Sequence, residues 1–220
     1  MAFPFQLDSL QRRREKMVRT QLAERGIRDP RVLSAMSNVP RHEFVPEDYR
    51  QDAYEDHPLP IGEGQTISQP YIVAAMLEHL ALQANDRVLE IGTGSGYVTA
   101  LLARLCAEVY SMERHAPLAG AAENTLQRLG FCNVRIKVGD GSQGCAEYAP
   151  FDAILVSAAT PLMPPALFDQ LREGGRMTAP VGPSSSQELQ LIHKIDGQPK
   201  LVVLEGCRFV PLVEGTVDGG

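Results

Sequence analysis

The segment Val88-Leu-Glu-Ile-Gly-Thr-Gly-Ser-Gly-Tyr97 decides the fold. Its apolar start, bounded by Arg87 and a cluster of glycines, is typical of a short buried strand. Gly92, Gly94 and Gly96 let the backbone turn sharply, because glycine adopts a positive φ at no steric cost and leaves room for a ligand. Apolar residues then recur at helical spacing, so a helix begins where the loop ends. Together these features predict a nucleotide-binding turn at the carboxyl end of a parallel strand.

The spacing of the glycines distinguishes two kinds of nucleotide site. A dinucleotide-binding turn needs the pattern Gly-x-Gly-x-x-Gly, and here the third glycine comes one residue early. With Glu90 just before the turn, the pattern Glu-x-Gly-x-Gly-x-Gly resembles the S-adenosylmethionine loop of class I methyltransferases. An ordinary glycine-rich turn without a ligand is the alternative. Acidic residues further along the chain fall where such a cofactor needs them, and they favour the cofactor site.

Composition places the chain among ordinary globular proteins. It has 220 residues and a formal net charge of −6, and no apolar stretch approaches the ~20 residues that a bilayer span needs. The negative charge argues against a nucleic-acid partner, since such proteins usually carry a basic face. No apolar segment follows the basic run at 12–16, so no signal peptide is predicted. Four widely spaced cysteines indicate reduced thiols, and we expect a cytoplasmic protein without membrane attachment.

We expect one α/β domain over residues 1–220. Residues 1–70 form an N-terminal segment with helices at 9–25 and between Pro30 and Pro40, followed by an irregular stretch up to Pro70. So long an irregular stretch in a compact domain is usually functional or disordered, and apolar anchors among its turn residues favour function. Residues 71–220 form the cofactor-binding core.

Beyond the glycine loop, strands and helices alternate. The expected strands lie at 109–112, 134–138, 151–156 and 176–180, and the expected helices at 117–129 and 165–171. Such alternation predicts a mostly parallel, doubly wound sheet. The C-terminal part differs, because two strands at 189–195 and 201–207, joined around Asp196-Gly197, predict an antiparallel hairpin.

Thr66 and Ser68 lie just ahead of a helix that is expected to begin at Pro70. The free N–H groups and the positive dipole end of a helix favour an anion at such a position. Ser68 alternatively serves only as the cap of this helix. Spacing alone leaves both roles open.

Three acidic residues fall at or just after the ends of three neighbouring strands: Glu90, Glu113 and Asp140. Ligands of a doubly wound sheet bind outside the carboxyl ends of the strands. An acid that ends the second strand can accept both ribose hydroxyls of a nucleotide, which predicts this role for Glu113. Asp140, between two glycines, can accept from the adenine amine. Taken singly, Glu113 could be an ordinary surface acid and Asp140 an ordinary turn residue. Three acids at the ends of three neighbouring strands together favour the cofactor site.

No pair of nucleophile and base is evident, and no metal-ligand spacing is present. The five histidines are scattered. Methyl transfer to a carboxylate needs no general base, because a carboxyl group with a pKa of about 4 is already ionised at neutral pH. Its remaining requirement is in-line approach to the methylsulfonium. Hydroxyl and backbone donors near Ser68 suit such an acceptor.

Short motifs spread over most of the chain carry a family resemblance: Met17-Val-Arg-Thr-Gln-Leu22, Val39-Pro-Arg41, Phe44-Val-Pro46, Leu59-Pro-Ile61, Gly64-Gln-Thr-Ile-Ser-Gln-Pro70, Val88 to Tyr97, Gly139-Asp-Gly141, Pro150-Phe-Asp-Ala153, Pro180-Val-Gly182 and Arg208-Phe-Val-Pro-Leu212. The chain resembles the protein-L-isoaspartate O-methyltransferases, specifically their bacterial members. The glycine loop alone marks only a methyltransferase. The segments at 65–70 and 208–212 are far more specific.

The resemblance implies a Rossmann-like class I methyltransferase fold that uses S-adenosyl-L-methionine. The family methylates the α-carboxyl of L-isoaspartyl residues in damaged proteins and peptides. The ester closes to a succinimide, whose hydrolysis returns some normal aspartate. We therefore expect isoaspartyl proteins as substrates, with the enzyme acting as a monomer.

Site residues follow from the same resemblance. In this family the serine of the Thr-Ile-Ser segment is the active-site residue, which is Ser68 here. The expected cofactor contacts are Glu90, Gly92, Thr93, Gly94, Ser95, Gly96, Glu113, Asp140 and Gly141. The expected contacts with the peptide substrate are Gln65, Thr66, Ile67 and Val210. No metal is expected.

The chain departs from the family pattern at a few positions. Ser142 stands where the family often has tryptophan, Val98 stands where it often has glutamine, and Thr160 stands where it usually has proline. These differences bear on substrate preference and not on the reaction. A class I methyltransferase acting on a small carboxylate metabolite remains the alternative. A dinucleotide-dependent oxidoreductase is disfavoured by the glycine spacing, and a non-catalytic binding module leaves the stretch at 57–70 unexplained.

Overall fold

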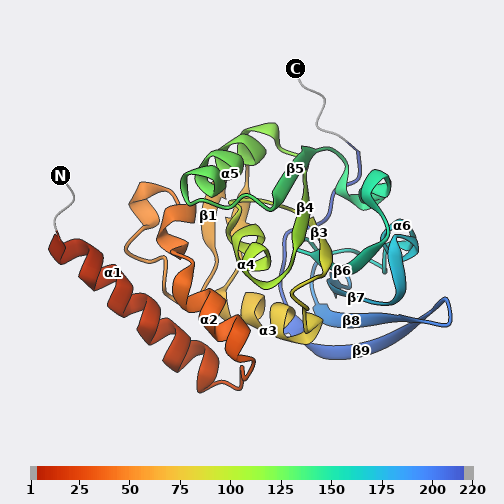
Figure 1. Cartoon of the computed structure of the whole chain (residues 1–220), viewed down its shortest axis with the longest axis horizontal. Helices are drawn as coiled ribbons and strands as arrows, with labels where there is room; N and C mark the ends of the chain where they lie inside the picture. The colour runs from red at the N-terminus through yellow and green to blue at the C-terminus, as the bar shows by residue number, and fades with distance from the viewer. Residues whose placement is uncertain (1–3, 216–220) are drawn as a thin grey trace.

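A seven-stranded mixed sheet organises the computed structural model, which describes residues 4–215 (Figure 1). In sheet order the strands are β5 (Val134–Val138), β4 (Glu108–Glu113), β3 (Arg87–Ile91), β6 (Phe151–Val156), β7 (Leu171–Val181), β8 (Gln187–Ile195) and β9 (Gln198–Cys207). The first five of these pair in parallel, whereas β8 and β9 are antiparallel. The predicted doubly wound sheet with a C-terminal hairpin is confirmed. The hairpin turns at Asp196 and Gly197, which both have a positive φ.

Helices cover both faces of the sheet. On one face lie α3 (Pro70–Leu80), α4 (Tyr97–Leu105) and α5 (Ala116–Arg128), and on the other lies the short α6 (Pro165–Asp169). Side chains of a strand alternate between faces, so Val88 packs with α3 and α4 while Leu89 packs with α6. Within residues 4–215, no helix is both long enough and apolar enough to cross a membrane.

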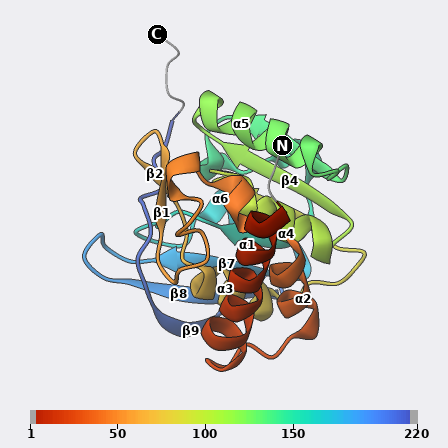
Figure 2. The ribbon, with the colours of Figure 1, turned by 90° about the vertical axis from the view of Figure 1, so that its left-hand side faces the viewer.

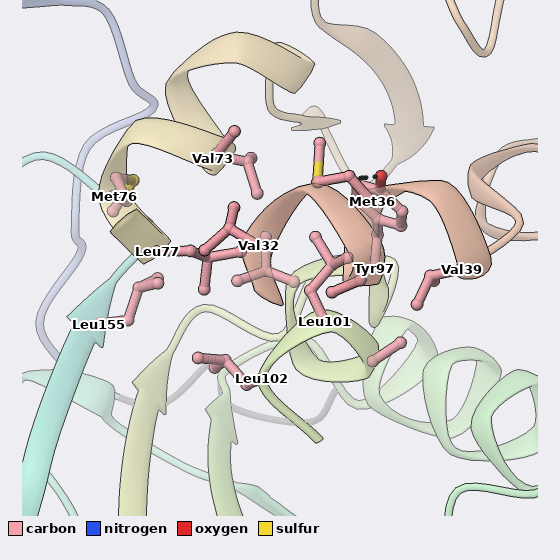
Figure 3. Close-up of a cluster of buried hydrophobic side chains, with 14 of the residues drawn as sticks. Val32, Met36, Val39, Val73, Met76, Leu77, Tyr97, Leu101, Leu102 and Leu155 are labelled. Carbon is pink, nitrogen blue, oxygen red and sulfur yellow. Dashed lines mark hydrogen bonds between the residues drawn. The ribbon is translucent and has the colours of Figure 1, made fainter. Parts of the chain in front are cut away.

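The N-terminal helices form a further layer outside α3 and α4 (Figure 1). α1 (Pro4–Lys16) continues into a π-helical segment (Met17–Ala23), and α2 (Pro30–Asn38) follows. As predicted, α2 begins after a cap, because the Asp29 carboxylate accepts a 2.7 Å hydrogen bond from the Arg31 amide. Figure 3 shows the apolar side chains of α2, α3 and α4 packed together, with the Tyr97 hydroxyl 3.6 Å from the Met36 sulfur. The second layer therefore rests on the helix that follows the glycine loop.

The stretch expected to be irregular contains a short hairpin. β1 (Leu59–Gly62) and β2 (Gln65–Ile67) pair antiparallel, after two 3₁₀ turns (Arg41–Phe44 and Glu47–Tyr49). Strands this short, interrupted by proline and glycine, carry no detectable periodicity in the sequence. The β1–β2 hairpin lies beside the segment that leaves β9 (Figure 2).

β7 is also longer than the strand predicted at 176–180. It begins at Leu171, where α6 was expected to end, and runs through Gly174-Gly175. Its pairing with β6 shifts register between Phe151 and Ala153, which is the irregularity that the glycines accommodate.

A buried ion pair joins the end of α3 to β7. Arg176 is 9% exposed and Asp86 is 2% exposed. The Arg176 guanidinium donates to the Asp86 carboxylate at 2.5 Å and to the Ala81 carbonyl at 3.0 Å, and it also donates to the Leu80 carbonyl. Every contact is charge-assisted, and together they fix the turn that leads into β3.

Replacing Arg176 by methionine should destabilise the fold by about 3–5 kcal/mol, because the Asp86 carboxylate would stay buried without its counter-charge. Urea denaturation measures the change. The double variant Arg176→Met/Asp86→Leu should recover much of the loss, since it removes both charges. If the double variant were no more stable than the single one, loss of packing rather than the unpaired charge would explain the effect.

Candidate active site

The glycine loop after β3 holds three backbone segments close together. Gly92, Gly94 and Gly96 have φ values of +90°, +53° and +86°, a region that side chains disfavour. A Cβ on Gly94 would lie 3.3 Å from the Ile61 side chain of the β1–β2 hairpin, and one on Gly96 would lie 3.1 Å from the Cβ of Ala122 in α5. The loop then ends where α4 begins at Tyr97, as predicted. The glycines are needed for both the turn and these close contacts.

Glu113 connects this loop to the end of β4. It is only 5% exposed. One carboxylate oxygen accepts a 2.8 Å hydrogen bond from the Gly94 amide, and the other accepts a 2.9 Å bond from the His115 amide. Each oxygen retains a second lone pair, and Glu113 lines the pocket beside the loop. Its position suits it to accept hydrogen bonds from a diol in that pocket.

Glu90 lies below the loop instead of in the pocket. It is fully buried, and the hydroxyls of Thr99 in α4 and of Ser111 in β4 each donate to one of its carboxylate oxygens at 2.6 Å. The Thr93 hydroxyl, 2.6 Å from that of Ser111, extends this network to the loop. Burial raises the pKa of Glu90 to about 8, although hydrogen bonds from Ser111 and Thr99 lower it. Glu90 thus supports the loop from inside the fold and does not line the pocket, and its predicted contact with the cofactor stays a prediction.

Asp140 and Gly141 follow β5 at the rim of the same pocket. The Asp140 carboxylate accepts the amide of Ser142 at 2.9 Å and the amide of Gly215 at 2.7 Å. Burial alone would raise the pKa of Asp140, but these hydrogen bonds hold it below its ordinary value. Gly141 lines the pocket, and a Cβ there would lie 2.6 Å from a methyl group of Ile91. Only glycine fits at position 141 without moving the Ile91 side chain.

The cofactor pocket, as we call this hollow, brings together most of the predicted residues. Those that line it are Gln65, Thr66, Ile67, Ser68, Gly92, Thr93, Gly94, Ser95, Glu113, Gly141 and Val210. Glu90, Gly96 and Asp140 are not part of its wall. Apolar residues complete it, among them Ile91, Met112 and Leu212. The pocket thus combines one carboxylate with bare backbone and apolar surface.

A second hollow, the acceptor pocket, adjoins the first. It lies between the start of α3 and the end of β9, and its lining includes Arg25, Arg208 and Glu205 as well as apolar residues such as Phe209. Thr66, Ser68, Ser157 and Val210 line both pockets and therefore form the passage between them.

Ser157 is a site residue that sequence reasoning missed. It follows β6 directly. β6 lies next to β3 in the sheet, and the chain continues from β3 towards one edge of the sheet and from β6 towards the other. Ligands bind at such a switch point, so its place after a predicted strand was a usable signal. Like the Ser68 hydroxyl, its hydroxyl has no hydrogen-bond partner among residues 4–215.

The structure separates the two roles considered for Ser68. Gln69 occupies the cap position of α3, and its side chain makes no cap hydrogen bond. The Ser68 hydroxyl makes no hydrogen bond to the helix N-terminus within the described chain. Capping by Ser68 is therefore excluded, and its side chain belongs to the passage.

The three departures from the family pattern lie near the site. Val98 lines the cofactor pocket, whereas Ser142 and Thr160 are buried outside its wall. In the part of the chain that the structure describes, no cluster of three or more histidine, cysteine or acidic side chains could hold a metal ion.

A family model and curated relatives name the same family for this chain. The family model described as Protein-L-isoaspartate(D-aspartate) O-methyltransferase matches residues 12–217. A protein-L-isoaspartate O-methyltransferase of Koribacter versatilis is 56% identical over 200 residues, covering 91% of this chain and 90% of the relative. The protein-L-isoaspartate O-methyltransferase of Methanoculleus marisnigri is 54% identical over 206 residues, which cover 94% of this chain and 94% of the relative.

Solved structures agree with this result. A protein-L-isoaspartate O-methyltransferase superimposes with a TM-score of 0.82 at 33% identity, covering 90% of this chain and 65% of the other. A putative protein-L-isoaspartate O-methyltransferase from Plasmodium falciparum, in complex with S-adenosyl-L-homocysteine, has a TM-score of 0.80 at 29% identity, covering 91% and 98% of the two chains.

The buried Glu90 predicts a pH-dependent stability. Its pKa rises from 4.5 to about 8 on folding, so between these values the folded state binds the extra proton and the free energy of unfolding falls as pH rises. Glu90→Gln removes this titration. Urea denaturation should therefore show similar stabilities for the two proteins at about pH 5 and a less stable wild type at about pH 9. A constant difference across this range would mean that Glu90 titrates normally in the fold.

Proposed function

This chain belongs to the protein-L-isoaspartate(D-aspartate) O-methyltransferase family, and we propose that its two joined pockets carry out the reaction of that family. The chain is an S-adenosylmethionine-dependent methyltransferase that acts on the carboxyl group of L-isoaspartyl residues in damaged proteins. The reading as an enzyme for a small carboxylate metabolite gives way to this one. What remains to be assigned is the role of each residue.

The residues of the cofactor pocket fit the nucleoside part of S-adenosylmethionine. Glu113 offers lone pairs for the ribose hydroxyls, and the backbone at Gly94 and Gly141 is bare of side chains. Ile91 and Met112 supply an apolar wall for a purine ring. When bound, the cofactor supplies an activated methyl group on a sulfonium. The complex of the Plasmodium falciparum relative with S-adenosyl-L-homocysteine supports a nucleoside site in this fold.

The acceptor pocket fits a carboxylate on a polypeptide. Arg208 attracts an anion, while Phe209 and Ile72 offer apolar surface for neighbouring side chains. An isoaspartyl α-carboxyl is ionised at neutral pH, so the pocket needs no base to activate it. Its task is to hold the carboxylate oxygen in line with the methyl group.

Ser68 and Ser157 perform this positioning at the passage. Both line the two pockets, and neither hydroxyl is engaged within residues 4–215. Each hydroxyl is free to donate to one carboxylate oxygen, which fixes its direction without protonating it. Val210 also lines both pockets, and its apolar side chain helps to exclude water from the reacting atoms.

The observation that carries this proposal is the passage itself. A pocket suited to a nucleoside and a pocket suited to an anionic peptide meet at free hydroxyls, with no nucleophile–base pair between them. Methyl transfer to an ionised oxygen requires these features and no others.

The decisive assay is transfer of labelled methyl groups to an isoaspartyl peptide and to its aspartyl twin. We expect methylation of the first and none above background for the second, because only the isoaspartyl linkage leaves an α-carboxyl free to enter the passage. Free isoaspartate serves as the control for the peptide pocket and should react poorly. Equal labelling of the two peptides would contradict the proposed acceptor.

Ser68→Ala should lower turnover on the isoaspartyl peptide about 100-fold, since one positioning donor near changing charge is lost. Affinity for S-adenosyl-L-homocysteine, measured by calorimetry, should stay within about twofold because the cofactor pocket remains intact. The melting temperature should change little, because the hydroxyl caps no helix. A rate within about twofold of wild type, worth under roughly 0.5 kcal/mol of barrier, would remove Ser68 from the active site.

A further inference from the structure

Asp56 holds the start of α3 from a distant part of the chain. It lies between the 3₁₀ turn at Glu47–Tyr49 and β1, with its side chain 24% exposed. One carboxylate oxygen accepts a 3.3 Å hydrogen bond from the Tyr71 amide, and the other accepts a 2.8 Å bond from the Gln69 side chain. The second oxygen also accepts from the Arg25 guanidinium. Three segments of the chain thus meet at one carboxylate.

The contact with Tyr71 does the work of a helix cap. The first N–H groups of a helix lack partners within it. The cap residue Gln69 does not accept a hydrogen bond from any of them through its side chain. Asp56 satisfies one of these groups and places a negative charge at the positive end of the helix dipole. A serine just ahead of a helix often has this role. Because the cap position is Gln69 and the cap bond comes from Asp56, the Ser68 hydroxyl stays free for the passage.

The same carboxylate fixes the wall of the acceptor pocket. The Arg25 guanidinium stacks on the Tyr71 ring, 3.6 Å from its centroid, while it contacts Asp56. Arg25, Gln69 and Tyr71 all line the acceptor pocket. Their positions therefore depend on a residue that is itself outside the pocket wall.

We propose that Asp56 is a positioning residue for Ser68 and that it keeps the serine hydroxyl aimed into the passage by capping α3 in its place. This inference rests on the proposed function, because it concerns the orientation of the methyl acceptor. Residues 69 and 71 are bound to Asp56 on the C-terminal side of Ser68. Without these bonds, the backbone on the C-terminal side of Ser68 loses one of its anchors and the hydroxyl shifts relative to the acceptor.

Asp56→Ala tests the proposal, with Asp29→Ala as the matched control. Asp29 caps α2 in the same way through the Arg31 amide but lies outside both pockets. Both variants should lose thermal stability to a similar extent. Asp56→Ala alone should also lower kcat on an isoaspartyl peptide about tenfold, since small misplacements of a reacting group are costly. Its affinity for S-adenosyl-L-homocysteine should stay within about twofold of wild type.

Asp56→Asn separates positioning from folding. Asparagine keeps an oxygen for the Tyr71 amide and fits the same space, so this variant should retain most of the rate that Asp56→Ala loses. Rescue by asparagine shows that the cap, and not the charge, is what the serine needs. If asparagine were as slow as alanine while remaining folded, the cap would not be the cause.

A double-mutant cycle with Ser68→Ala gives the sharpest readout. In the Ser68→Ala background, Asp56→Ala should change kcat by less than about twofold, because no hydroxyl remains to be misplaced. An equal tenfold loss in both backgrounds would show a general structural role and overturn the proposal. So would an Asp56→Ala enzyme as fast as wild type. Failure of the wild type itself to methylate the isoaspartyl peptide would instead overturn the proposed function, and this inference with it.

Discussion

The hydrogen bond from the Gly94 amide to the Glu113 carboxylate is the contact on which the rest of the site depends. It joins the ends of β3 and β4, so the turn after β3 has one conformation. The β1–β2 hairpin contacts this turn at Gly94, and α5 contacts it at Gly96. Because these approaches leave no space for side chains, the glycines determine where the walls of both pockets lie.

Two glutamates on adjacent strands show how burial assigns different tasks to the same side chain. Glu90 faces α4 and, with its raised pKa, is largely protonated at neutral pH, where it accepts from two hydroxyls and supports the loop. Glu113 lies at the pocket and binds backbone amides on both oxygens. Charge is thereby kept out of the core and placed where a ligand with hydroxyl groups would be recognised.

The sequence predicted the elements whose signal is periodic or local. The doubly wound strands, the capped start of α2 and the turn at Asp196-Gly197 all follow from patterns within a few residues. The β1–β2 hairpin was not predictable in this way, because it is held by contacts with the distant glycine loop. The burial of Glu90 could have been inferred from strand alternation, which places it on the same face as Val88. The cap from Asp56 could not, since nothing local connects it to α3.

The two pockets share the residues of the passage but otherwise draw on different parts of the chain. Residues between β3 and the turn after β5 supply most of the donor side, whereas the acceptor side comes from the regions around 58–72 and 205–210. Substitutions at 205–209 leave the glycine loop and its contacts untouched. The fold therefore allows the range of accepted proteins to diverge between lineages while the source of the methyl group stays the same.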